Sequence, residues 1–205
     1  MGGGAPARAG APASVSLSGV RLVLASASPR RADLLRSAGF QFQVVPVDVD
    51  ERLLAGEDPA VMVQRLATEK AALVSDRVPD GAVIGADTVV VVDGVILGKP
   101  GDDRDAAGML RRLSGRSHEV LTGVAVHANG RRLVAVERTV VWFLPLSDAD
   151  IAWYVSSGEP LDKAGAYAVQ GLASRFVTRI EGSYSNVVGL PVARVCELLN
   201  RITAC

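Results

Sequence analysis

Apolar runs of strand type alternate with shorter helical patterns along the chain. The run from Gly81 to Val92 consists almost wholly of small and β-branched residues, which is typical of a strand buried on both faces. Gly81 and Gly85 leave space for another backbone or a ligand to approach. Asp87 interrupts the run, and an ionised carboxylate needs a partner when buried. It is a candidate for catalysis or metal binding; the alternative is a structural hydrogen bond to a turn.

Further strands and two tight turns are predicted around this segment. The dipeptides Asp93-Gly94 and Asn129-Gly130 are typical of two-residue hairpin turns. The predicted strands cover residues 21–25, 42–47, 81–92, 95–97, 118–127, 133–143 and 176–180. The part that contains residues 118–143 is interpreted as a meander on a second lobe.

Capping residues mark the predicted helix starts. Ser28 precedes Pro29 and Asp58 precedes Pro59, which places a cap before a first-turn proline in each helix. Ser147 begins a pattern that resembles a capping box. Helices are predicted from residue 29 to 39, from 59 to about 74, from about 103 to 113, from 147 to 158 and from 191 onward. Strands that alternate with helices indicate a mixed α/β fold.

Two arginines lie in the first turn of the helix that follows Ser28. The positive charges of Arg30 and Arg31 interact unfavourably with the helix dipole there, which costs roughly 0.3–1 kcal/mol of stability for each arginine. An anion bound at this strand-to-helix turn would reverse that cost; the alternative is two solvated side chains. Successive helical residues point about 100° apart, so Arg30 and Arg31 are expected to do different jobs.

Two lysines are further candidates for an anion site. Lys70 falls within a helical stripe that includes Val63 and Leu66, which favours an inward-facing side chain, although a lysine can also snorkel to solvent. Lys99 follows the first predicted hairpin, which returns the chain toward Asp87. The two lysines and the arginines therefore suggest a shared pocket for an anion.

Other polar segments have more than one interpretation. Asp48, Asp50 and Glu51 follow a predicted strand and form either a metal-facing edge or a solvated turn. Residues 159–171 mix polar side chains with small ones, which suits the wall of a binding site. His118 begins a strand and is interpreted as structural. The common nucleotide-binding and zinc motifs are missing from the sequence, so any phosphate site is of another type.

Composition narrows the function classes. The 205 residues are 49% hydrophobic, enough for one domain or two closely packed lobes. Lys+Arg and Asp+Glu are both 22, and this balance argues against a nucleic-acid partner. The apolar runs are too short for a membrane span, and the two cysteines indicate no disulfide framework, so a cytoplasmic protein is expected. Residues 1–18 are predicted to be a disordered tail, and residues 19–205 a single catalytic domain of two lobes.

Taken together, the ordered motifs between Leu22 and Leu199 resemble the Maf family of nucleoside triphosphate pyrophosphatases. They are Ser26-Ala-Ser-Pro-Arg-Arg31, Glu69-Lys70, Gly85-Ala-Asp-Thr88, Lys99-Pro100, Leu113-Ser-Gly115, Gly158-Glu-Pro-Leu-Asp-Lys-Ala-Gly-Ala-Tyr167, Val169-Gln-Gly171 and Asn186-Val-Val-Gly-Leu-Pro191. The resemblance implies an α/β fold like that of inosine triphosphatases, with a long curved mixed sheet, flanking helices and a central cleft between two lobes. It also implies a possible homodimer.

The resemblance further implies hydrolysis of a nucleoside triphosphate between its α and β phosphates, with a divalent metal (Mg²⁺ or Mn²⁺) and Asp87 as the proton acceptor. A carboxylate with the ordinary aspartate pKa of about 3.9 is a weak base for water. Asp87 therefore needs either a raised pKa or a metal-bound water, and both roles, base and ligand, stay open. Glu51 and Asp87 are the carboxylates expected near the metal.

The remaining site residues are expected to contact either the phosphates or the base of the nucleotide. Preorganised positive groups are the most effective help for a phosphoryl transition state, and that role is expected of Ser28, Arg31, Lys70 and Lys99.

Within the family, Arg30, Thr88 and Gln170 resemble the dTTP/UTP subgroup, and the Gln170 amide matches the O4/N3–H edge of uracil or thymine. Ala168 departs from the glycine usual in the family, and its methyl group would narrow the wall beside Gln170. The alternatives are a 7-methyl-GTP-type pyrophosphatase and a regulatory nucleotide-binding protein acting in septum inhibition.

Overall fold

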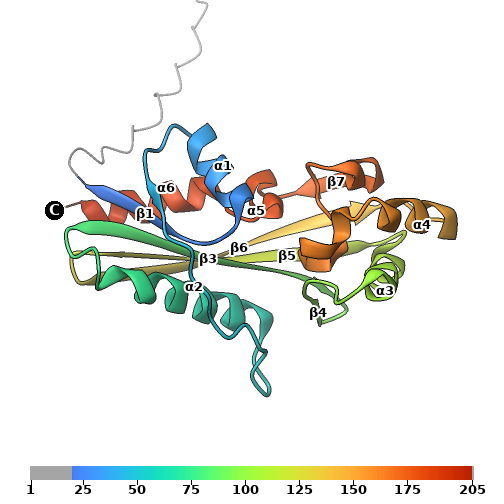
Figure 1. Ribbon diagram of the computed structural model, residues 1–205, viewed down its shortest axis with the longest axis horizontal. Helices are drawn as coiled ribbons and strands as arrows, with labels where there is room; N and C mark the ends of the chain where they lie inside the picture. The colour runs from blue at the N-terminus through green and yellow to red at the C-terminus, as the bar shows by residue number, and fades with distance from the viewer. Residues whose placement is uncertain (1–19, 205) are drawn as a thin grey trace, which may run out of the picture.

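One mixed seven-stranded sheet runs through the computed structural model, which describes residues 20–204 (Figure 1). The strands are β1 (Arg21–Ala25), β2 (Gln43–Val44), β3 (Gly81–Val92), β4 (Val95–Leu97), β5 (Ser117–Ala128), β6 (Arg131–Phe143) and β7 (Val177–Glu181). Their order is β2-β1-β3-β5-β6-β7, and β4 also pairs with β3. The two contacts of β1 are parallel and the other pairs are antiparallel. The predicted mixed α/β fold is thus confirmed.

Helices cover both faces of this sheet. They are α1 (Pro29–Ser37), α2 (Pro59–Ser75), α3 (Asp103–Leu113), α4 (Asp148–Ser156), α5 (Tyr184–Val188) and α6 (Val192–Thr203), with the 3₁₀ helices η1 (Glu159–Asp162), η2 (Ala164–Ala166) and η3 (Leu172–Phe176). The long helix α2 packs on one face, and α1 and α6 pack on the other (Figure 1). A separate hydrophobic cluster packs α3, α4 and the 3₁₀ segments together at the far end of the sheet.

Several local predictions agree with this arrangement, and one strand is shorter than predicted. Asp58 caps α2 by accepting from the Ala60 N–H, and Ser147 forms a full capping box with Asp150. The predicted strand over residues 42–47 is wrong in extent, because only β2 pairs with β1. Since β1 ends at Ala25 before the turn into α1, the later residues lose their neighbouring strand.

Two glycines on the sheet allow α2 to approach closely. A Cβ atom would lie 2.1 Å from the Ala67 carbonyl oxygen at Gly85, and 2.1 Å from the Val63 carbonyl oxygen at Gly123. Gly123 is the register partner of Asp87 in the β3–β5 pair, so both face α2. The close contact therefore brings the buried side of α2 next to Asp87.

The outer edge of β3 is interrupted. β1 pairs with β3 as far as Gly85, and β4 pairs with it from Val90 onward. In the described part of the chain, residues 86–89 therefore lack a strand neighbour on that edge. The chain leaves β1 into α1 on one side of this gap and leaves β4 on the other side. Side chains from both faces of β3 can reach the space between them.

Two further points concern the predicted tail and membrane-spanning helices. The tail predicted for residues 1–18 lies outside the described residues. Among the helices of residues 20–204, none combines the length and the apolar character that crossing a membrane requires.

Candidate active site

A cleft of about 550 Å³ opens at the interrupted edge of β3, a size suited to a small-molecule ligand. Its walls come from the turn into α1, from β3, from the segment before α2, from the segment after β4 and from the 3₁₀ region. Every predicted site residue lines it: Ser28, Arg30, Arg31, Glu51, Lys70, Asp87, Thr88, Lys99 and Gln170. The fold thus brings together side chains that are up to 142 positions apart in the sequence.

An acid–lysine–acid group forms one side of the cleft. The Lys70 Nζ atom lies 2.6 Å from Asp87 Oδ1 and 2.6 Å from Glu51 Oε1. The Lys70 and Asp87 side chains are only 7% and 9% exposed, whereas Glu51 is 49% exposed at the mouth. Lys70 therefore faces inward, as expected, but it is bound to two carboxylates before any ligand arrives.

The charges around Glu51 favour its ionised form. Burial raises the pKa of this carboxyl, whereas the hydrogen bond and the charge of Lys70 both lower it. Lys99 and Arg31 add to the lowering, so the pKa lies below its ordinary value. Glu51 is therefore a carboxylate at neutral pH.

Arg31 connects three parts of the chain beneath the cleft. Its Nε donates to the Gly189 carbonyl at 2.8 Å, and its Nη1 donates to the Ala86 carbonyl at 2.8 Å and to Ser26 Oγ at 3.3 Å. Its Nη2 donates to Thr88 Oγ1 at 3.0 Å. Burial lowers the pKa of this guanidinium. Four of its five N–H groups thus have protein acceptors, so Arg31 holds the cleft together in addition to contributing charge.

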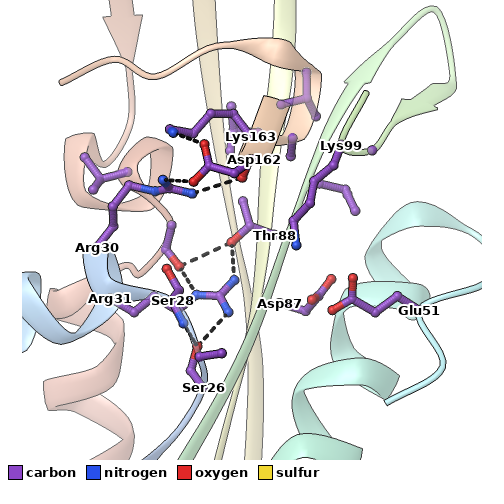
Figure 2. A pocket seen from close by; sticks show the side chains of 18 of the residues that line it. Ser26, Ser28, Arg30, Arg31, Glu51, Asp87, Thr88, Lys99, Asp162 and Lys163 are labelled. Atoms are coloured by element: carbon purple, nitrogen blue, oxygen red, sulfur yellow. Dashed lines mark hydrogen bonds and ion pairs between the residues drawn. The ribbon is translucent and has the colours of Figure 1, made fainter. Parts of the chain in front are cut away.

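Arg30 points in a different direction and reaches the opposite wall. Its Nη1 lies 3.1 Å from Asp162 Oδ2, and Lys163 pairs with the same carboxylate (Figure 2). The two neighbouring arginines therefore do different jobs, as helix geometry predicted. Arg30 joins the start of α1 to the end of η1 across the mouth of the cleft.

Thr88 is held on the face of β3 opposite Asp87. Its hydroxyl accepts from Arg31, lies 2.9 Å from Thr122 Oγ1 and lies 3.2 Å from the Gly189 carbonyl oxygen. Because successive strand residues point to opposite faces, Asp87 and Thr88 flank the open edge from two sides. The hydroxyl is thereby fixed as part of the cleft wall.

The three remaining predicted residues are all at least partly exposed. Lys99 extends from the segment after β4, and its ammonium group points toward Asp87 and Thr88 (Figure 2). Ser28 stands at the N-cap of α1, but within residues 20–204 its side chain makes no capping hydrogen bond. Gln170 lies exposed on the turn between η2 and η3. These groups are placed where a ligand can reach them.

Residues 21–202 match the family described as Maf-like protein. The chain belongs to the Maf family. The dTTP/UTP pyrophosphatase of Symbiobacterium thermophilum is 54% identical over 181 residues, which cover 88% of this chain and 93% of that protein. The dTTP/UTP pyrophosphatase of Koribacter versatilis is 53% identical over 183 residues, covering 89% and 95%. The predicted resemblance is therefore confirmed.

A more distant likeness is found among solved structures. A nucleoside-triphosphatase, also described as a dITP/XTP pyrophosphatase, from Mycobacterium abscessus aligns with 91% of this chain and all of its own. The sequence identity is 17% and the TM-score is 0.43.

The carboxylates of this Maf protein suit a divalent metal ion that also binds substrate phosphates. In the part of the chain that the structure describes, no three His, Cys, Asp or Glu side chains gather into a metal-binding group. Glu51 and Asp87 supply two carboxylates on the cleft wall. Mg²⁺ is commonly bound by one or two carboxylates together with substrate phosphates, so this donor set fits it.

Several residues of the Maf cleft were given no individual role by the sequence. Ser26 and Gly189 hold Arg31, and Asp162 and Lys163 close the mouth with Arg30. Thr122, which contacts Thr88, could have been noticed in the sequence. Like Thr88, it is a polar residue within an apolar strand. The role of Gly189 depends on its carbonyl oxygen, which leaves no signal in the side-chain pattern.

Proposed function

We propose that this Maf protein hydrolyses dTTP and UTP to the monophosphate and pyrophosphate. Two proteins named dTTP/UTP pyrophosphatase are more than half identical to it over nearly nine-tenths of the chain. One observation carries the proposal: a buried carboxylate, Asp87, lies in a cleft whose other walls supply cationic side chains. That is the arrangement needed to bind a polyphosphate and attack it with water.

The cations would hold the phosphates. A triphosphate carries about three to four negative charges, and the transition state spreads more charge onto the phosphoryl oxygens. Lys99 projects into the cleft, and Arg31 and Lys70 contribute positive charge from its buried side. The Ser28 hydroxyl and the first N–H groups of α1 add hydrogen-bond donors at the other end of the cleft.

Asp87 would act on the attacking water. Its Oδ1 atom accepts from Lys70, which holds the carboxylate in one orientation and leaves Oδ2 as the atom to accept a proton or to bind a metal. Glu51 and Asp87 would hold a Mg²⁺ or Mn²⁺ ion. When bound, such an ion neutralises charge on the phosphoryl oxygens.

Arg30, Thr88 and Gln170 would select the base. The Gln170 amide offers one acceptor and two donors, which suits the carbonyl and N–H edge of uracil or thymine. Arg30 lies at the mouth and Thr88 lies in the wall, so the three surround the cleft from different elements.

We also propose where the protein acts and what it binds there. The partner is a nucleoside triphosphate, and we place the protein in the cytoplasm because the nucleotide pools are there. A homodimer is proposed from the family resemblance, and light scattering on the purified protein would test it.

Pyrophosphate release from dTTP, UTP, CTP and 7-methyl-GTP, with and without Mg²⁺, tests the function. We expect release from dTTP and UTP in the presence of the metal. Turnover of 7-methyl-GTP alone would indicate the other subgroup. Nucleotide binding without pyrophosphate release would favour the regulatory alternative.

The substitution Gln170→Glu tests how the base is read. The carboxylate loses the donor and adds a negative charge, so we expect turnover of dTTP and UTP to fall while the melting temperature stays close to that of the wild type. An equal loss of turnover on every triphosphate would contradict base reading by Gln170.

A further inference from the structure

The turn that carries Gln170 is attached to the protein at both of its ends. On one side the Ala168 N–H donates to the Tyr154 hydroxyl at 3.3 Å. On the other side the Leu172 N–H donates to Glu159 Oε2 at 2.9 Å, and the Ala173 N–H lies 3.5 Å from Glu159 Oε1. Residues 168–173 are thus anchored on either side of Gln170.

The two anchors are bonded to each other. The Tyr154 hydroxyl donates to Glu159 Oε1 at 2.8 Å, and Tyr154 is a fully buried residue of α4. Burial and the neighbouring Glu159 carboxylate raise the pKa of the Tyr154 hydroxyl, so it stays protonated as a donor. The pair therefore forms one support that joins the packed α4 to the turn.

The Gly171 backbone packs tightly against the Glu159 side chain. A Cβ atom at Gly171 would lie 2.2 Å from Glu159 Oε2. The carboxylate packs directly against the backbone that follows Gln170, so the position of Glu159 restrains that backbone. Neither Glu159 nor Tyr154 lines the cleft.

We propose that Glu159 and Tyr154 are positioning residues that set pyrimidine selectivity by fixing the main chain at Gln170. This inference rests on the proposed function, because it concerns how the base is read at the same site. Gln170 is exposed, so its amide can distinguish two bases only where the backbone beneath it is held in place. UTP and CTP differ only at the exchangeable edge that this amide would read.

The test compares kcat/KM for UTP and CTP in the wild type and in Tyr154→Phe. The substitution removes the hydroxyl that joins Glu159 to the Ala168 N–H and leaves the ring in the core. We expect the UTP/CTP ratio of kcat/KM to fall by about tenfold, which corresponds to ~1.4 kcal/mol. The inhibition constant of inorganic tripolyphosphate, which reports on the phosphate site alone, should stay unchanged.

A matched control and a second variant separate selectivity from folding. Tyr184→Phe makes the same chemical change at a half-exposed tyrosine of α5 and should leave the ratio unaltered. Glu159→Gln keeps the side-chain shape but weakens the acceptor, and it should lower the ratio even where Tyr154→Phe folds poorly.

A double-mutant cycle shows whether the pair acts through Gln170. In a Gln170→Ala background, Tyr154→Phe should cause no further change in the UTP/CTP ratio. The inference is overturned if the UTP/CTP ratio is unaffected in folded Tyr154→Phe and Glu159→Gln. It is also overturned if Tyr154→Phe and Gln170→Ala change the ratio additively. A wild-type protein that is inactive on UTP would instead overturn the proposed function itself.

Discussion

Lys70 is the residue on which the electrostatics of the cleft depend. It lies between Asp87 and Glu51 at 2.6 Å from each, and it is almost fully buried. A buried carboxylate that loses its cation is strongly destabilised, because the charge keeps its desolvation penalty without compensation. Both the stability of the protein and its activity therefore depend on the Lys70 side chain.

Replacing Lys70 with methionine should reduce stability and activity together. We expect Lys70→Met to lower the free energy of unfolding by about 3 kcal/mol, the lower end for a broken buried pair because the cleft lets water reach Asp87. Urea denaturation measures this, and Gln64→Met on the exposed side of α2 should change it by less than about 0.5 kcal/mol. Equal stability of Lys70→Met and the wild type would contradict the account.

The sequence predicted the inward orientation of Lys70 but not its partners. Its helical spacing from Val63 and Leu66 places it on the buried face of α2. Glu51 was one of three nearby acids, of which Asp50 instead pairs with Arg52 at the surface. Which acid turns inward depends on the path of an irregular segment, and the side-chain pattern carries no information about that path.

At the scale of elements, the contact between α2 and the sheet sets the geometry of the site. Gly123 and Gly85 let the helix backbone lie where side chains would otherwise stand. The expectation that Gly85 admits another backbone is met by α2. The interrupted edge of β3 could not be foreseen, because it depends on where β1 and β4 stop pairing rather than on residues 86–89 themselves.

A methyl group at Gly123 should push α2 away from the sheet. Its position would be 2.1 Å from the Val63 carbonyl oxygen, so the backbone must move. We expect Gly123→Ala to destabilise the protein by about 1–3 kcal/mol and to reduce activity, since Lys70 moves with the helix. Thermal unfolding and dTTP turnover measure the two effects.

Gly108 supplies the control for this prediction. It lies exposed within α3, and a Cβ atom there would have open space. Gly108→Ala should stabilise the protein by up to about 1 kcal/mol through helix propensity alone. If both alanine variants were equally stable, close packing of α2 would not be the constraint.

At the scale of the whole molecule, long-range contacts complete the cleft. Arg30 meets Asp162 across 132 positions, and Arg31 meets Gly189 across 158. The family motifs predicted that these segments belong to one site, whereas the individual bonds depend on the tertiary path between them. The buried His118 also links distant segments, because its Nε2 lies 2.8 Å from the Tyr167 hydroxyl behind the cleft.

The buried His118 should make the protein less stable in acid. Burial lowers its pKa from 6.5 to about 4, so the unfolded chain takes up the proton more readily than the folded one. This contribution to stability is complete above pH 6.5 and is lost as the pH falls toward 4, by roughly 3 kcal/mol in all. Urea midpoints between pH 7 and 4 should fall more steeply for the wild type than for His118→Phe; parallel curves would contradict the prediction.

The most direct test of the cleft is the product balance on dTTP for the wild type and Asp87→Asn, measured as pyrophosphate and dTMP. The account predicts one pyrophosphate for each dTMP from the wild type, and a rate lower by about 10²–10⁴-fold in Asp87→Asn at an unchanged circular dichroism spectrum. Release of orthophosphate in place of pyrophosphate, or near-normal turnover by Asp87→Asn, would contradict it.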